Sequence, residues 1–592
     1  GRIPFVSAAE AKTYVDKLLA YMSHKPGKTD TWKSNMLMIG EYGDQYIHTT
    51  QTESFIDNFN YEITPKTSDT PEIRTRNDNA VNFNKIYLEP YDNVDNLQAT
   101  REKLVEDFNV GQNFILFVGH SNISSLTKPT VLMNLQQAID TKYDVPPVMY
   151  FSSCDVGRYD GGQTSFIDKL LLNPDGGIIA AVAATREAYT SLNGRLTDSF
   201  AKYLGISESD SRFYAKYEKT WGRVLMFAKN FSTDRSRNRL KYHLLGDPAM
   251  LVDIPCDRTE VTEVNGVAAS KGIAIGAMTP ITIKGRVRND AGEVDTDFNG
   301  YAKISLYDSE KYYMTQGDET LTERGAELAV TSADVTAGEF TATIIAPNCI
   351  TTDDKEKPLQ VTAVSNDGTV VSGFYNGLTF DRSLSAVSDD TTAPTINAFY
   401  INDKSTFKDG MEVESSLRLK AEVTDDVALN LSHEQIATTA YISIDGGEHV
   451  YPVCSYQLDG ADNCIIDQGI YNLKSGRHTA ELVVADMSGN VATRTIAFYV
   501  AVSDNATLTV DTTALIHSVT FDVENADNYT DAKLVVSDNS GNVVLRPDVG
   551  SFPYTWGGSD NNGNRLAEGN YNATAIIDGK SLRQKKIVVV KQ

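Results

Sequence analysis

NFILFVGH at residues 113–120 and PPVMYFSSC at residues 146–154 are two apolar stretches of strand length. The first ends in His120 and the second in Cys154. The segment between them has room for one crossover helix, and a strand, a crossover helix and a second parallel strand form a right-handed unit. The two stretches therefore predict neighbouring parallel strands whose carboxyl ends, with the imidazole and the thiol, meet at one edge of a sheet.

The alternation of apolar runs with helical segments continues on both sides of these stretches, over residues 1–255, and is typical of an α/β domain with a mainly parallel sheet. A turn and an amphipathic helix open this region. We predict strands over 35–40, 84–88, 113–119, 147–152, 177–184 and 249–252. We predict further helices over 94–107, 130–141, 165–172, 195–204 and 214–230.

After Pro255 the helical periodicity gives way to short alternating stretches such as ITIKGRV and LRLKAEV, which Gly, Asp and Asn turns separate. This pattern predicts immunoglobulin-like β-sandwiches in series. A polar stretch at 383–394, SLSAVSDDTTAP, reads as a linker, and a weaker break falls near Ser503. We divide the tail into sandwiches over 256–385, 394–502 and 503–592.

Length and charge restrict the class of protein. A chain of 592 residues exceeds one hydrophobic core and indicates several domains. Its net charge of -25 repels phosphate, and no basic stripe offsets it, so we expect no nucleic-acid partner. The longest apolar run, 177–184, is too short to cross a bilayer, so we expect no transmembrane segment. We also expect any targeting sequence to have been removed.

Five cysteines are distributed unevenly, with Cys154 the only one in residues 1–255. Cys454 and Cys464 flank a polar turn, which predicts a short cross-strand disulfide in an oxidising compartment. Unrelated thiols are the alternative, because spacing alone does not fix connectivity.

The predicted meeting of Cys154 and His120 has chemical meaning. A thiol becomes a strong nucleophile when an adjacent imidazole takes its proton, and the pair suffices to begin acyl transfer. Backbone N–H groups of Ser121 and Cys154 are candidates for the oxyanion hole that such a reaction needs. A single cysteine after a strand is more often a small buried residue, so the argument depends on the matched pair. No local spacing predicts a metal site.

An ordered series of motifs strengthens this interpretation: GRIPF, KIYLEPY, FVGH, YFSSCDVGRYDGG, GGIIAAVAATREAYTSLNGRL, FAKN and LLGDPAMLVDIP. The series resembles the gingipain family of caspase-fold cysteine peptidases, most closely the C-terminal signal peptidases of type IX secretion (the PorU type), across residues 1–255. The resemblance implies a caspase-like fold, His120 as general base and Cys154 as nucleophile.

The resemblance also places a third acid after the first strand. Glu41 is our choice, to orient the imidazole or line the substrate site, with Asp44 as the second candidate; a solvated turn carboxylate is the alternative. Asp44, Asp155 and Arg186 are candidates for substrate binding, the latter two on loops that follow strands. Ser121 stands where the family usually has glycine, so we expect its side chain to alter substrate access.

The tail resembles the same relatives, with YTWGGSDNNGNRLAEGNY, residues 554–571, similar to a FlgD-like immunoglobulin module. The resemblance implies a cysteine endopeptidase at the bacterial cell surface or secreted. It would remove C-terminal secretion domains from exported proteins, with sortase-like transfer as an extension and outer-membrane secretion components as partners. It implies no required cofactor, although relatives often bind structural calcium. Two alternatives remain: a gingipain-like surface protease outside any secretion machine, and a catalytically idle binding protein.

Overall fold

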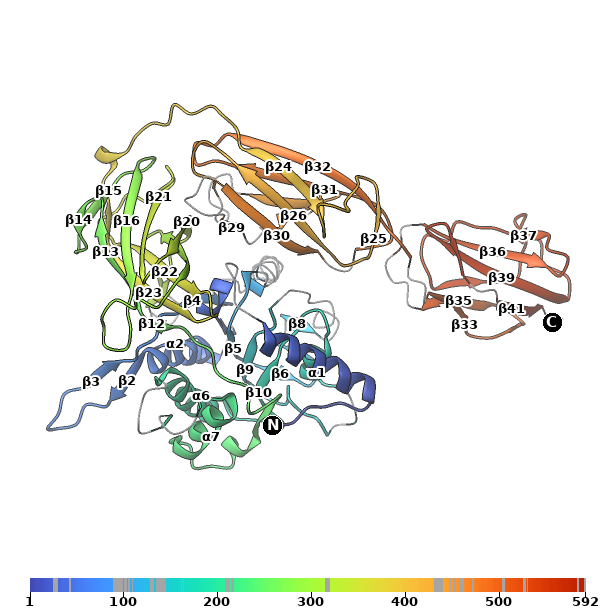
Figure 1. Ribbon diagram of the computed structural model, residues 1–592. Coiled ribbons are helices and arrows are strands. Elements are labelled where there is room, and N and C mark those ends of the chain that lie inside the picture. Colours follow the sequence, from blue (N-terminus) through green and yellow to red (C-terminus); the bar gives the residue numbers. More distant parts are fainter. Residues whose placement is uncertain are drawn as a thin grey trace.

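The computed structural model describes residues 1–592 except 25–29, 42–43, 89–99, 101–103, 105–106, 109, 128–131, 135–144, 161, 163, 208–212, 215–217, 315–319, 431–439, 448, 451–453, 457–462, 471–472, 503–505, 525–528, 530, 583–584 and 590–592. Within these described ranges the chain folds into an α/β domain followed by three β-sandwiches (Figure 1). No described helix is both long and apolar enough to cross a membrane.

The α/β domain is built on a six-stranded sheet with the order β11-β10-β9-β5-β1-β4. Its strands are β1 (Asn35–Gly40), β4 (Asn82–Tyr87), β5 (Phe114–Val118), β9 (Val148–Ser152), β10 (Ala180–Ala184) and β11 (Tyr242–Leu245). All neighbours are parallel except β10 and β11. Every residue of β5, β9 and β10 is buried, because helices cover both faces of a parallel sheet. The predicted mainly parallel α/β fold is confirmed.

Alternate residues of each strand enter two separate cores. Phe114 and Leu116 of β5 pack against α2 (Ile47–Asn60), α6 (Thr190–Gly205) and α7 (Trp221–Phe231). Ile115 and Phe117 pack on the opposite face, against α1 (Ala8–Ser23) and α5 (Phe166–Leu172). Because successive side chains of a strand point to opposite faces of the sheet, each strand contributes to both cores. The first turn of α5 is closed by a capping box between Ser165 and Asp168.

The structure of this domain differs from the sequence predictions in two places. No strand forms over 249–252, where Leu251 makes one isolated bridge to Thr220. The edge strand is β11, which precedes that segment and pairs antiparallel with β10. Helix α2 was not predicted, because its buried face carries His48, Thr49 and Thr52 as well as apolar residues. Most of the helices predicted over 94–107 and 130–141 lies outside the described residues.

Shorter elements connect the main ones. They are η1 (Asp30–Ser34), η2 (Asp44–Tyr46), β2 (Tyr61–Thr64), β3 (Ile73–Arg76), β6 (Ser121–Asn122), β7 (Ser125–Leu126), β8 (Met133–Asn134) and η4 (Asn238–Lys241). Strands β6, β7 and β8 form a small antiparallel sheet that begins directly after His120.

Each region of the tail has two sheets around its own core. The first comprises β12 (Cys256–Asp257), β13 (Thr259–Val264), β14 (Val267–Ala268), β15 (Ile273–Ile275), β16 (Pro280–Val287), β17 (Gly300–Tyr307), β20 (Glu327–Val335), β21 (Glu339–Ile345), β22 (Lys357–Ser365) and β23 (Val370–Phe380), with the hairpin β18 (Lys311–Met314) and β19 (Thr320–Glu323) beside it. A short helix, η5 (Arg382–Leu384), follows this sandwich.

The second sandwich comprises β24 (Thr395–Ile401), β25 (Glu412–Val413), β26 (Leu417–Thr424), β27 (Tyr441–Ile444), β28 (His449–Val450), β29 (Cys454–Tyr456), β30 (Asn463–Ile470), β31 (Gly476–Ala485) and β32 (Val491–Val500). The third comprises β33 (Thr507–Val510), β34 (Ala514–Leu515), β35 (Val519–Glu524), β36 (Ala532–Asp538), β37 (Val543–Leu545), β38 (Tyr554–Trp556), β39 (Gly569–Ile577), β40 (Lys580–Ser581) and β41 (Lys585–Val589). This last sandwich lies at the far end of the molecule (Figure 1).

The disulfide between Cys454 and Cys464 stays a prediction. Strands β29 and β30 do pair, but their register places Cys454 opposite Ile466 and Cys464 opposite Tyr456. The two cysteines are therefore diagonal neighbours in this strand pair, not directly opposite each other. Cys464 is buried in the core of the second sandwich.

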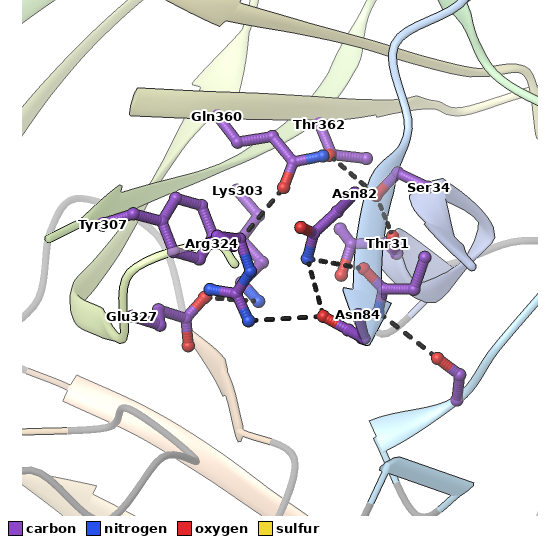
Figure 2. Close-up of polar contacts among 12 residues, drawn as sticks. Thr31, Ser34, Asn82, Asn84, Lys303, Tyr307, Arg324, Glu327, Gln360 and Thr362 are labelled. Atoms are coloured by element: carbon purple, nitrogen blue, oxygen red, sulfur yellow. Dashed lines mark hydrogen bonds and ion pairs between the residues drawn. The ribbon is translucent and has the colours of Figure 1, made fainter. Parts of the chain in front are cut away.

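The first sandwich contacts the α/β domain through polar side chains (Figure 2). Ser34 Oγ of η1 lies 3.2 Å from Thr362 Oγ1 of β22 in a buried hydrogen bond. Arg324, which follows β19, donates to Asn84 Oδ1 of β4 over 3.3 Å, and its guanidinium lies 4.2 Å from the centre of the Tyr307 ring. The sandwich is therefore fixed to the β4 edge of the central sheet.

Candidate active site

The ends of β5 and β9 bring the predicted pair to one place. The two strands are parallel neighbours, with Val118 opposite Ser152. His120 and Cys154 each lie two residues beyond this last pair. The imidazole and the thiol therefore follow adjacent strands at the same edge of the sheet, as the crossover argument predicts.

Two carboxylates contact His120 in different ways. Asp44 Oδ2 lies 2.9 Å from the ring nitrogen Nε2, within hydrogen-bonding distance. The buried Glu41 carboxylate accepts the backbone N–H of His120. We expected Glu41 to orient the imidazole, with Asp44 second. The geometry instead places Asp44 at the ring and Glu41 at the peptide that carries it.

Local backbone explains how both acids reach His120. Asp44, Gln45 and Tyr46 have consecutive positive φ angles of 49°, 57° and 64°, a left-handed conformation that is costly for residues with a Cβ. Gly119 allows the Glu41 side chain to approach the chain that carries His120. A Cβ at this position would lie 2.5 Å from Glu41 Cβ and 2.6 Å from Glu41 Oε2. The chain thus accepts strain after β1 and a glycine after β5 to bring these groups together.

His48 of α2 lies beside His120, and sequence reasoning assigned it no role. The two rings are edge to face with centres 5.2 Å apart, and His48 is 1% exposed. Burial, and then the neighbouring His120, lower the pKa of His48 to about 4, so its imidazole is neutral at physiological pH. Glu41, His48 and His120 each offer a ligand atom, and these atoms all lie within 4.8 Å of one another. The expectation of no metal site considered only local spacing and missed this group.

Cys154 is half-buried, and the backbone of Ala188 holds its sulfur. The Cys154 thiol donates to the Ala188 carbonyl oxygen over 3.1 Å, and the Ala188 N–H donates to Sγ over 3.3 Å. Across the described part of the chain no hydrogen bond joins the sulfur to His120. The thiol and its predicted base are therefore close in topology but turned to other partners, as is common before substrate binds.

Ser121 does not project as we expected. Its hydroxyl donates to the carbonyl oxygen of Cys154, and the side chain is 5% exposed. The residue therefore links the peptide after β5 to the peptide after β9. Among the described acceptors, none takes the Cys154 backbone N–H, which is consistent with the predicted role of that group in an oxyanion hole.

Asp155 and Arg186 lie on the Cys154 side of the site. The backbone N–H of Asp155, whose φ is 53°, donates to the Arg186 carbonyl oxygen over 3.3 Å. The Arg186 guanidinium forms two hydrogen bonds with the Asp160 carboxylate, and these bonds lower the pKa of Asp160. Asp160 was not predicted, although it lies in the loop after Cys154. Tyr189, the next residue after Ala188, is exposed.

The arrangement can support nucleophilic acyl transfer. A thiol and an imidazole follow adjacent strands, a carboxylate contacts the imidazole, and a backbone N–H lies beside the thiol. These are the components that the attack of a thiolate on a carbonyl requires.

Two family models match parts of this chain. Residues 1–253 match the model of peptidase family C25, and residues 503–578 match the model of the FlgD Ig-like domain. Latent dimeric PorU from Porphyromonas gingivalis is 21% identical, over 71% of this chain and 41% of that chain, with a TM-score of 0.28. The complex of P. gingivalis RgpB pro- and mature domains is 17% identical, over 64% of this chain and 76% of that chain, with a TM-score of 0.34.

This chain thus spans about 41% of the length of latent PorU. No curated protein matches it. The family model, the ordered motifs and the residues at the ends of β5 and β9 point to the same family. The N-terminal domain, residues 1–253, belongs to peptidase family C25, the family of the gingipains.

Proposed function

We propose that this chain is a cysteine endopeptidase in which Cys154 is the nucleophile and His120 the general base. The observation that carries the proposal is the parallel pairing of β5 with β9, which puts both residues beyond adjacent strand ends. The family match supports the reaction class. The reaction needs no cofactor, because a thiol and an imidazole suffice for acyl transfer.

The contacts in the site suggest the order of events. Substrate binding would displace the Cys154 thiol from Ala188 and allow His120 to take its proton. Asp44, 2.9 Å from His120 Nε2, would hold the ring and stabilise the imidazolium that forms. The thiolate attacks the peptide carbonyl, the Cys154 N–H stabilises the oxyanion, and the imidazolium protonates the leaving amine. Water then hydrolyses the acyl-enzyme.

For the substrate, the motif series favours the secretion peptidases. On this basis the chain would act at the bacterial cell surface, remove C-terminal secretion domains from exported proteins and contact outer-membrane secretion components. An amine that replaced water at the thioester would give sortase-like transfer. A gingipain-like surface protease that acts outside any secretion machine is the second candidate, because the family model matches the shared catalytic domain alone.

Labelling with a thiol-reactive peptide electrophile tests the proposed dyad. We expect labelling of the native protein at Cys154, its loss in Cys154→Ala and a strong reduction in His120→Ala. Cys349→Ala is the matched control, because it removes an exposed thiol of the first sandwich and should leave Cys154 labelling unchanged. A folded native protein whose Cys154 does not react would contradict the peptidase proposal and favour a binding protein.

Product analysis tests the substrate. The protein is incubated with unrelated peptides and with C-terminal domains of secreted proteins, with and without an added amine, and the products are identified by mass spectrometry. Selective cleavage before the C-terminal domains supports the secretion role, and an amine adduct supports transfer. Cleavage of all peptides alike would favour the general surface protease.

A further inference from the structure

Side chains from three distant parts of the chain lie close together, and one of them is the proposed base, His120. Glu41 follows β1, His48 lies in the first turn of α2 and His120 follows β5. We propose that these three residues form a binding site for zinc or a similar transition-metal dication, and that the bound ion blocks the peptidase. The binding itself does not depend on the proposed function, whereas the inhibition does.

The geometry matches a zinc site without large movements. One carboxylate oxygen of Glu41 and one nitrogen of each histidine lie within 4.8 Å of one another. Ligands of a tetrahedral zinc ion with bonds of about 2.0–2.2 Å lie about 3.4 Å apart, so changes of χ angles would close the site. The edge-to-face contact of His48 with His120, 5.2 Å between ring centres, already holds the two imidazoles next to each other.

His48 provides an independent reason to expect a ligand. Its side chain is 1% exposed, and within the described ranges its Nδ1 atom has no hydrogen-bond partner. A buried polar atom without a partner costs about 1–3 kcal/mol, so such atoms in native proteins usually have a bound water, ion or functional role. One ring nitrogen of His48 is among the three ligand atoms that lie within 4.8 Å of one another, so an ion bound there would contact this buried imidazole.

The donor types select the ion. Two imidazoles and one carboxylate suit zinc and its neighbours, whereas calcium takes six to eight oxygens and magnesium keeps several waters. Asp44 adds negative charge on the more exposed side, with Oδ2 2.9 Å from His120 Nε2 and 3.8 Å from His48 Nε2. A dication between these groups is therefore favoured by charge as well as by coordination.

Metal binding would affect the proposed reaction directly. A histidine that coordinates a metal through one nitrogen loses that lone pair, and the ion holds the ring in place. His120 could then neither turn towards Cys154 nor accept its proton. The chain would be inactive while zinc is bound and would recover when a chelator removes the ion.

The test measures binding in the full chain with Cys154→Ala, so that the thiol of the site cannot supply a ligand. Zinc affinity is determined by calorimetry, and cobalt is used as a spectroscopic probe because its visible bands report nitrogen and oxygen coordination. We expect saturable one-to-one binding, visible cobalt bands, and a loss of affinity of at least about tenfold in His48→Gln. His243→Gln is the matched control, because His243 is a partly buried histidine of β11 outside the cluster.

Glu41→Gln provides a second ligand variant in case His48→Gln fails to fold, which circular dichroism and thermal unfolding would show. Weaker zinc binding in either folded variant, with unchanged binding in His243→Gln, supports the site. Equal affinity in the ligand variants and the control, or the absence of cobalt bands, would overturn it. Inhibition of Cys154 labelling by zinc in the native chain, reversed by chelation, then tests the inhibitory consequence separately.

Discussion

Asp198 provides a sharp test of the electrostatics of the α/β domain. It lies on α6, where its Oδ1 accepts a hydrogen bond of 2.8 Å from Ser54 Oγ of α2. Burial raises the pKa of Asp198 from 3.8 to about 6, and the hydrogen bond from Ser54 offsets only part of that effect. The folded protein therefore retains this proton at pH values where the unfolded chain has released it.

The sign and size of the effect follow from linkage. Between about pH 4 and pH 6 the folded state binds more protons than the unfolded state, so stability falls as pH rises through this window. A shift of about two units corresponds to about 3 kcal/mol, and partial solvent access reduces this to about 2 kcal/mol. Asp198→Asn cannot ionise and keeps an oxygen that accepts from Ser54. We expect the variant to be about 2 kcal/mol more stable than the native protein above about pH 7 and equally stable near pH 4.

Urea unfolding monitored by tryptophan fluorescence measures this difference, because Trp32 and Trp221 are buried in the same domain. Asp69→Asn, on an exposed loop, is the control and should not change the pH dependence. A stability difference between Asp198→Asn and the native protein that is the same at both pH values would refute the reasoning. So would a variant that is less stable at neutral pH.

Three further substitutions test packing and hydrogen bonding in the α/β domain. Gly119→Ala should destabilise the domain by about 1–3 kcal/mol, because its Cβ would overlap Glu41, and thermal unfolding would reveal the loss. Ser121→Ala removes the hydroxyl bound to the Cys154 carbonyl and should cost about 1 kcal/mol and slow electrophile labelling; an unchanged labelling rate would contradict its positioning role. Lys17→Met should cost about 2–4 kcal/mol in urea unfolding, because the three N–H donors of the buried Lys17 ammonium are surrounded by four backbone carbonyl oxygens near the end of α5, at 2.9–3.2 Å. A loss no greater than that of an exposed lysine would contradict this account.

The central strands could be predicted because their signal is local. β1 appears over the residues predicted for it, β5 is one residue shorter at each end than predicted, and β9 begins one residue later than predicted, since all three are short apolar runs. Their pairing followed from the crossover rule. Helix α2 was not predicted, because a helix can bury polar groups such as hydroxyls that bond to its own preceding turn. Thr52 Oγ1 donates to the His48 carbonyl oxygen in this way.

The details of the site could not be predicted, because they depend on conformations that residue type does not reveal. Asp44 reaches His120 through a left-handed stretch of three residues that all carry a Cβ, which sequence patterns disfavour. The contact of Cys154 with Ala188 depends on how the chain leaves β10. Candidate residues could therefore be identified, whereas their partners required coordinates.

The order of the strands in the sheet explains which groups contact one another at the site. Strands β10, β9, β5 and β1 are consecutive neighbours, and the chain that leaves each one supplies a group to the site: Ala188, Cys154, His120 and Glu41 respectively. Adjacent strands lie about 5 Å apart, so each group first meets its neighbours along the sheet edge. The Cys154 thiol forms its hydrogen bond on the β10 side, with Ala188, and His120 forms its hydrogen bonds with Glu41 and Asp44, which follow β1. Between them, the Ser121 hydroxyl donates to the Cys154 carbonyl oxygen and so links the chain after β5 to the chain after β9. In the proposed reaction the side chains of Cys154 and His120 would turn toward each other, while the sheet holds the backbones that precede them.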